Sequence, residues 1–391
     1  MIGLGFDPGF AAAGGRGAWI FAEDGRKILD GLCGEGVCNL GRRPEAVAAA
    51  LAKALDETDQ GNFPMISREK GDLAADLAAW APGDLDAVVF SVMRGEAMDA
   101  ALKIARGRTG RATLVSPDGG WYGETGFALS LSDRSDRDAF GPLIPQARQV
   151  PFGDLDAARR ELALGAAAFV LEPVQTERHG REAEPRYLQG LRDACDASGA
   201  LLVLDETWTG LGRTGKRLAC ERAGVVPDIL VLGEALGAGV FPIAATLLRR
   251  DVNKFLEAHP LIHLSTFGGS DLGCRVATAA LETYERERPW TKAARTGARL
   301  REGLEIIRSR RPGALRSVAG RGLLLSLELD DEFRAVAFCR AAADAGLLVR
   351  PERVMKRAVL LAPSLLLSDD EADGILVAVD AALGALDGEP I

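Results

Sequence analysis

Short apolar runs alternate along the chain with longer segments in which apolar residues recur at helical spacing. The short runs are rich in Val, Leu and Ile and are apolar at consecutive positions rather than at every second one. This pattern is typical of parallel strands that are buried on both faces of a sheet. It predicts strands at residues 88–91, 113–116, 167–171, 201–205, 229–232 and 243–248.

Two stripes of apolar residues lie between these strands at the spacing i, i+4, i+7, i+8. One contains Ala97, Ala101, Ile104 and Ala105, and the other contains Tyr187, Leu191, Ala194 and Cys195. This spacing predicts amphipathic helices that cover the sheet. The central part of the chain is therefore expected to be an α/β domain with a mostly parallel sheet.

The last hundred residues have a different pattern. A helical pattern from about 290 to 310 precedes strands at 323–329, 347–350 and 359–362, and a final helix follows Ser368. This order predicts a smaller α+β domain. Strand-like pieces at 18–21 and 27–30 are too few to form a core of their own. We expect residues 1–48 to join the small domain, 49–284 to form the large domain and 285–391 the small one.

Composition narrows the possible functions. The 391 residues are 47% hydrophobic and 26% charged, as in an ordinary globular protein, and the net charge is −9. No long basic run is present, which argues against a nucleic-acid partner. No stretch reaches 18 apolar residues, and the N-terminus has no signal-peptide pattern. We expect a cytoplasmic protein with no membrane association.

Cysteine and histidine spacing argues against a metal site. The six cysteines are scattered, with no CxxC or CxxH pair, and the chain has three histidines. His259 and His263 are four residues apart, but Pro260 between them disfavours a helix that would bring them together. We expect reduced thiols and no bound metal.

The sharpest local feature is the run LLVLDET at 201–207. This run predicts a buried strand of five residues that ends in Asp205, with Glu206 directly after it. The two acids would lie at the C-terminal edge of a parallel sheet, which is where ligands of open α/β folds bind. An aspartate there can hold a protonated ring nitrogen by a charge-assisted hydrogen bond. The alternative is a carboxylate that caps the next turn.

Four loops contain glycine or small polar residues that would let backbone N–H groups approach a phosphate. They lie at 94–96, 119–123, 233–237 and 265–269. Each is also compatible with an ordinary turn. In the second loop, Trp121 is suited either to stacking on a planar ring or to anchoring the loop in the core.

The order and spacing of these motifs resemble one family. The segment 201–245, LLVLDETWTGLGRTGKRLACERAGVVPDILVLGEALGAGVFPIAA, is similar to the cofactor region of class III aminotransferases, which are fold-type I pyridoxal-phosphate enzymes that include acetylornithine, ornithine and putrescine aminotransferases. The resemblance extends to GEAMDAALKIAR at 95–106, GGWYGETGFALSLS at 119–132, LEPVQTERHG at 171–180 and HLSTFGGSDLGCRVATAALE at 263–282. It implies a large domain with a seven-stranded, mostly parallel sheet, a small domain built from both chain ends, and a homodimer with sites at the subunit interface.

The resemblance assigns roles to several residues. Asp205 corresponds to the residue that faces the pyridine nitrogen, Trp121 to the aromatic that stacks on the ring, and Thr266 to the threonine that reaches the phosphate bound by the neighbouring subunit. The full set of residues at the implied cofactor site is Arg94, Gly95, Gly120, Trp121, Tyr122, Asp205, Trp208 and Thr266.

The largest departure from the family pattern lies in LVLGEALGAG. The family has there the lysine that forms the Schiff base, and this chain has Glu234. A carboxylate cannot form an imine, so only the proton-moving role of the lysine remains open to it. None of the eight lysines stands at another position that would replace it.

Other positions of the implied site also depart from the family. The phosphate-binding Ser-Gly-Thr is Met93-Arg94-Gly95 here, so a hydroxyl is lost and a cation is gained. Trp208 replaces the glutamine that meets the ring hydroxyl, and Tyr122 replaces a histidine. The arginine that binds a substrate carboxylate would fall at Leu360.

These changes favour a repurposed enzyme that has lost Schiff-base transamination. In this hypothesis the pocket performs acid–base chemistry on a small metabolite in a biosynthetic reaction, with Glu234 and Asp205 as catalytic residues and no covalent cofactor. Burial would raise the pKa of Glu234 unless a cation such as Arg94 lies beside it. The alternatives are an enzyme that binds pyridoxal or pyridoxamine phosphate noncovalently, and a non-catalytic pseudoenzyme or dimer partner.

Overall fold

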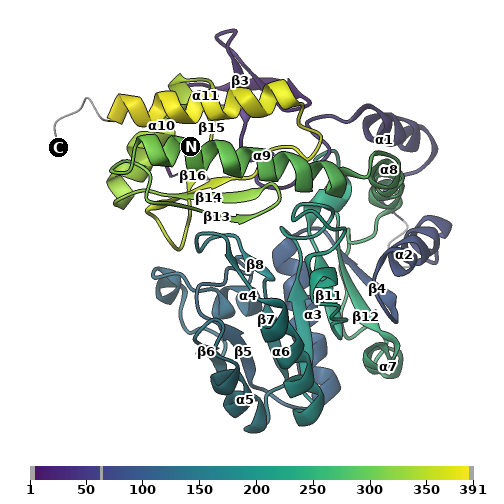
Figure 1. Cartoon of the computed structure of the whole chain (residues 1–391). Helices are drawn as coiled ribbons and strands as arrows, with labels where there is room; N and C mark the ends of the chain where they lie inside the picture. Colours follow the sequence, from purple (N-terminus) through teal and green to yellow (C-terminus); the bar gives the residue numbers. More distant parts are fainter. Residues whose placement is uncertain (1–4, 62–64, 387–391) are drawn as a thin grey trace.

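The computed structural model describes residues 5–61 and 65–386, which form a large domain below a smaller one (Figure 1). The large domain contains a seven-stranded sheet in the order β4-β12-β11-β10-β7-β5-β6. Its strands are β4 (Leu85–Ser91), β5 (Leu114–Pro117), β6 (Ala147–Val150), β7 (Ala168–Leu171), β10 (Leu201–Asp205), β11 (Ile229–Leu232) and β12 (Ala244–Arg249). Strand β12 runs antiparallel to both of its neighbours, β11 and β4, and the other neighbouring strands pair in parallel, so the predicted α/β class with a mostly parallel seven-stranded sheet is confirmed.

Helices cover both faces of this sheet and also pack beside its β4 edge. They are α1 (Glu45–Glu57), α2 (Arg68–Trp80), α3 (Arg94–Thr109), α4 (Gly126–Leu131), α5 (Leu155–Ala163), α6 (Pro185–Ser198), α7 (Arg250–Ala258) and α8 (Asp271–Glu287). The two predicted apolar stripes lie on the buried faces of α3 and α6. Alternate residues of β10 join different cores: Val203 packs with α3 and α7, whereas Leu202 and Leu204 pack on the opposite face.

The small domain takes strands from both ends of the chain. One sheet pairs β1 (Ala12–Arg16), β2 (Trp19–Ala22) and β3 (Lys27–Asp30) with β15 (Leu347–Leu348). The other has the order β13-β14-β17-β16, from β13 (Ser317–Arg321), β14 (Leu324–Glu328), β17 (Ala358–Leu361) and β16 (Arg350–Pro351). Helices α9 (Pro289–Arg310), α10 (Glu332–Asp344) and α11 (Asp369–Leu386) pack around these sheets (Figure 1).

A small hairpin lies at the boundary of the two domains. Its strands are β8 (Val174–Gln175) and β9 (Arg181–Glu182), and β9 packs near β13 of the small domain. The loop between the two strands contains Glu177 and His179, which bind small-domain residues. The C-terminal edge of the large sheet therefore faces the small domain.

Candidate functional site

The candidate site lies where β5, β7, β10 and β11 end and α3 begins. Asp205 is the last residue of β10, and Glu172 follows the end of β7. Asp205 lies on the same face of β10 as Val203 because strand residues two apart share a face, and that face is covered by α3. Arg94 is the first residue of α3, so sheet and helix geometry bring these residues together.

The guanidinium group of Arg94 is buried against two carboxylates. Its Nη2 and Nε donate to Asp205 Oδ2 at 2.6 and 3.1 Å. The same Nη2 lies 3.1 Å from Glu172 Oε1 and also donates to the carbonyl oxygen of Trp121. Only 7% of the Arg94 side chain is exposed, and the two carboxylates are buried. Ion pairs shielded from water in this way are strong interactions between the partners, although desolvation opposes their formation.

Two guanidinium groups lie over the indole ring of Trp121. The Cζ atoms of Arg94 and Arg353 are 4.7 and 4.8 Å from the ring centroid, which is cation–π distance. The backbone N–H of Trp121 donates to Glu172 Oε2 at 2.9 Å. The tryptophan therefore stacks on arginine side chains of its own chain.

The charges of this cluster perturb one another. Burial, together with the nearby Asp205, raises the pKa of Glu172 to about 7, although Arg94 acts in the opposite direction. Burial alone would lower the pKa of Arg94, but the Asp205 and Glu172 carboxylates raise it above its ordinary value. Arg94 is therefore charged throughout the physiological range.

Glu234 lies at the N-terminus of α3. Its Oε1 accepts the backbone N–H of Arg94 at 2.7 Å, and the side chain is half-buried. The first N–H groups of a helix have no partner within the helix, and the helix dipole favours negative charge there. The Glu234 carboxylate satisfies one of these groups, in the kind of position where helices also bind phosphate. Arg94 thus meets Glu234 through its backbone N–H, whereas its side chain binds Asp205.

The remaining predicted residues do not all face this cluster. Trp208 is buried, and its ring packs so closely on Gly36 that a Cβ atom there would lie 2.9 Å from it. Tyr122, predicted to line the pocket, lies in the core between the sheet and α3, where its hydroxyl donates to the Val170 carbonyl at 3.2 Å. Tyr122 is therefore a core residue rather than part of the pocket surface.

The two glycines of the predicted set lie in tight surroundings. A Cβ atom on Gly95 would lie 2.9 Å from the Thr125 side chain, and one on Gly120 would lie 2.5 Å from the Tyr122 hydroxyl oxygen. Thr266 is exposed in the segment between α7 and α8. In this single chain it lies outside the cluster, so its predicted contact with a neighbouring subunit stays a prediction.

Sequence reasoning missed several residues of the site. Glu172 follows a buried strand just as Asp205 ends one, and that signal would have found it. Arg353 belongs to an irregular segment after β16 and has no such signal. Arg350 lies directly opposite Leu360 across the β16–β17 pair, so an arginine is present one strand away from the position where the family pattern expects it.

Arg350 and Arg353 bind a buried glutamate at the domain boundary. Arg350 Nη2 and Arg353 Nη1 each lie 2.7 Å from Glu177 Oε1, and both arginines also bind Glu35. Burial alone would raise the pKa of Glu177, but the two arginines lower it to about 2. The Arg350 guanidinium is therefore already bound to the carboxylates of Glu177 and Glu35.

Within residues 5–61 and 65–386, no group of His, Cys, Asp and Glu side chains is arranged to hold a metal ion. Among the helices in the same part of the chain, none combines the length and hydrophobicity that crossing a bilayer requires.

Comparison with known proteins identifies the class of this α/β fold. The crystal structure of ornithine aminotransferase from Toxoplasma gondii matches this chain with a TM-score of 0.92 and 29% identity. The match covers 98% of this chain and 93% of that one. An amine transaminase from an uncultivated Pseudomonas species, in its pyridoxal-phosphate-bound form, matches with a TM-score of 0.90 and 29% identity over 96% of this chain and 95% of that one. The fold is that of the fold-type I aminotransferases.

Sequence comparison gives the family. The model of the family "Aminotransferase class-III" matches residues 8–383. An uncharacterized aminotransferase from Archaeoglobus fulgidus is 36% identical over 376 residues, which are 96% of this chain and 87% of that protein. The chain belongs to the class III aminotransferase family, as its motifs predicted.

The family implies pyridoxal phosphate, and the arrangement of side chains does not fit this cofactor. Asp205, expected to face the ring nitrogen, already accepts two N–H groups of Arg94. Trp121, expected to stack on the ring, is covered by Arg94 and Arg353. Glu234 places a carboxylate at the N-terminus of α3, which would repel a phosphate there.

Proposed function

We propose that this class III aminotransferase homologue does not catalyse amino-group transfer through a Schiff base and acts as a binding protein or dimer partner. The observation that carries the proposal is the ion pair between Arg94 and Asp205. A guanidinium resembles a protonated pyridine ring in charge and planarity, and it forms the same kind of charge-assisted hydrogen bond with a carboxylate. In this view, Arg94 replaces the ring and Glu234 replaces the phosphate with groups of the protein itself.

The charges of the two replacements support this interpretation. Arg94 brings one positive charge to the carboxylates of Asp205 and Glu172, and Glu234 brings one negative charge to the helix N-terminus. Arg94 and Glu234 are each paired without a bound molecule, so neither needs a cofactor as its partner, although Arg94 Nη1 has no hydrogen-bond partner among the described residues. The absence of a lysine at position 234 removes the covalent link as well.

A spectroscopic titration tests the proposal. Purified protein is mixed with pyridoxal phosphate, and the absorbance is followed above about 400 nm, where the bound cofactor absorbs in this family. We expect no new band, and after borohydride reduction we expect an intact mass without added cofactor. A saturable band would favour noncovalent cofactor binding, and an added mass would point to an unsuspected lysine; either result would contradict the proposal.

The accessibility of Glu234 favours a second candidate function, acid–base catalysis on a small metabolite. Glu234 is half-buried rather than fully enclosed, and it lies at the edge of the cluster beside the exposed Met93. If Glu234 exchanges a proton with a substrate, Glu234→Gln should lower turnover by roughly 10²- to 10⁴-fold with little change in ligand affinity. A binding protein would tolerate the same change.

A further inference from the structure

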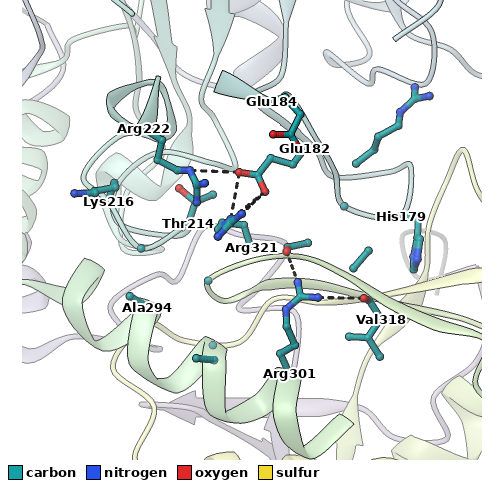
Figure 2. A pocket seen from close by; sticks show the side chains of 18 of the residues that line it. His179, Glu182, Glu184, Thr214, Lys216, Arg222, Ala294, Arg301, Val318 and Arg321 are labelled. Atoms are coloured by element: carbon teal, nitrogen blue, oxygen red, sulfur yellow. Dashed lines mark hydrogen bonds and ion pairs between the residues drawn. The ribbon is translucent and has the colours of Figure 1, made fainter. Parts of the chain in front are cut away.

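A large cavity lies at the domain boundary and shares no lining residue with the Arg94 cluster. Its volume is about 1150 Å³, slightly above the roughly 300–1,000 Å³ that is usual for ligand pockets. The large domain contributes the β8–β9 hairpin and the turns at 214–222, and the small domain contributes α9 and the β13–β14 turn. Figure 2 shows these elements around it, with Arg301 reaching up from α9 toward the β13–β14 turn.

The cavity is positively charged in a protein that is negative overall. Three acidic side chains line it, those of Glu182, Glu184 and Glu221, against six basic ones, a difference of +3 with His179 neutral. One of the six, Arg181, is paired with Asp118, which lies outside the lining, so the excess charge is +2. The whole chain has a net charge of −9. The basic residues are Arg178, Arg181, Lys216, Arg222, Arg301 and Arg321. A concave surface with one dominant sign of charge concentrates ligands of the opposite sign.

Several of these cations are not neutralised by carboxylates of the protein. Arg321 and Arg222 share one carboxylate, that of Glu182 (Figure 2). Arg301 donates to the backbone carbonyls of Val318 and Gly320, which are neutral, so its charge remains uncompensated. These two bonds leave other guanidinium N–H donors available, since arginine has five.

Lys216 and Arg178 make no ion pair or side-chain hydrogen bond with the described residues. Lys216 is exposed on the turn after Gly215, and Arg178 is half-buried in the β8–β9 loop. Long basic side chains that remain unpaired at a cavity wall are suited to binding anions because little desolvation and no broken ion pair opposes the contact. They also provide positions where charge can be removed without disturbing the fold.

We propose that this cavity binds a small molecule that carries a diphosphate or two phosphate groups. One phosphate monoester carries a charge of about −1.5 to −2 at neutral pH, so the excess charge of the lining is enough for one such group, and the distribution of the cations is the argument for two. The cations are distributed over both domains, which matches an extended anion better than a single carboxylate. Guanidinium groups bind phosphate through paired hydrogen bonds, and a lysine binds it as a point charge. This inference concerns a different set of residues from the proposed function and does not depend on it.

Calorimetric titration with inorganic pyrophosphate at low ionic strength tests the site. We expect saturable binding at one site per chain, and weaker binding as sodium chloride is added, because salt screens the exposed charges. The variant Lys216→Ala/Arg178→Ala should bind about tenfold or more weakly, since each lost contact is a charge-assisted hydrogen bond. Absence of binding to the unaltered protein, or equal binding to this variant, would overturn the proposal.

A matched control separates the cavity from nonspecific attraction. Lys53→Ala/Arg160→Ala removes the same two residue types from exposed positions on α1 and α5, outside the cavity. This control should bind pyrophosphate as the unaltered protein does, and an equal loss in both double variants would contradict a defined site. Citrate serves as the carboxylate probe: if it binds as tightly and depends equally on Lys216 and Arg178, the assignment to phosphate is wrong. Unaltered thermal unfolding without anions verifies that the variants fold.

Discussion

The guanidinium of Arg94 holds the carboxylate of Asp205 by two N–H groups, 2.6 and 3.1 Å from one oxygen. The two residues are 111 positions apart, one at the start of α3 and the other at the end of β10. In a class III aminotransferase, the family pattern leads one to expect a cofactor ring at this carboxylate. Here the guanidinium of Arg94 is bound to that carboxylate, and the consequences can be measured.

Removal of Arg94 should strongly destabilise the protein. Arg94→Met leaves the buried Asp205 and Glu172 carboxylates without a cation, so the free energy of unfolding should fall by about 3–5 kcal/mol. Urea unfolding of both variants measures this loss of free energy. The control is Arg299→Met, which breaks an exposed pair with Asp373 and should cost at most about 1 kcal/mol. Equal losses in the two variants would mean that the buried cluster is not a special source of stability.

The change Glu234→Lys alone should not create an aminotransferase. The new amine would lie in a site where the Arg94 guanidinium is still bound to Asp205 and still covers the Trp121 ring. We expect an absorbance band above about 400 nm with pyridoxal phosphate only when Arg94→Ala is added to Glu234→Lys, since the second change vacates the ring position. Efficient amino-group transfer by the single variant would show an intact aminotransferase pocket, and the proposed loss of function would be withdrawn.

Stability should depend on pH through Glu352, a buried residue at the domain boundary. Its Oε2 accepts the backbone N–H of His179 at 2.7 Å, and its Oε1 accepts the hydroxyl of Ser326. Burial raises the pKa of Glu352 to about 8, with Glu177 acting in the same direction and Arg350 in the opposite one. The folded state therefore keeps a proton that the unfolded chain loses near its ordinary pKa of 4.5.

The stabilisation from this proton is complete below about pH 4.5 and is lost as the pH rises through about 8. Between about pH 7 and 9, the free energy of unfolding should fall more steeply in the unaltered protein than in Glu352→Gln, which mimics the protonated form. The lowered pKa of His179 makes the free energy of unfolding rise with pH, which is the opposite effect. His179 loses its proton below this window, because its ordinary pKa is already lower than pH 7. The exposed Glu302→Gln is the control, and a slope unchanged by Glu352→Gln would refute the assignment.

We predict a homodimer whose interface includes the segment between α7 and α8. Four large apolar side chains are exposed there beside Thr266, at 53–79% of their area: Leu261, Ile262, Leu264 and Phe267. Contiguous exposed apolar residues indicate an interface, and the family resemblance places this loop at the opposite subunit's site. Ultracentrifugation at micromolar concentration should give a dimer.

A charge in this segment should dissociate the dimer. Leu264→Asp/Phe267→Asp is expected to yield a folded monomer, whereas Leu164→Asp, which alters an equally exposed leucine in the turn after α5, should leave the dimer intact. A monomeric unaltered protein would show that the family's assembly does not apply to this chain.

The sequence by itself determined the large sheet and its ligand-binding edge. Strands β10 and β11 have the predicted bounds because apolar runs of four or five residues are too short for a helix and are typical of strands buried on both faces of a sheet. The edge strands β6 and β13 were missed, since their partly exposed, polar or glycine-containing sequences lack that signal. The end of β10 also fixed where Asp205 would lie.

Only the tertiary structure decided what the site residues do. The sequence records that Arg94 and Glu234 are present, but not that the arginine side chain turns to Asp205 while its backbone N–H meets Glu234. Similarly, Tyr122 became a core residue and Arg350 came to lie across from Leu360. Local periodicity predicts which segments are helices and strands, because neighbours in sequence determine it. The partners of a charged side chain depend on strand register and on burial between elements far apart in the chain, which a linear pattern does not specify.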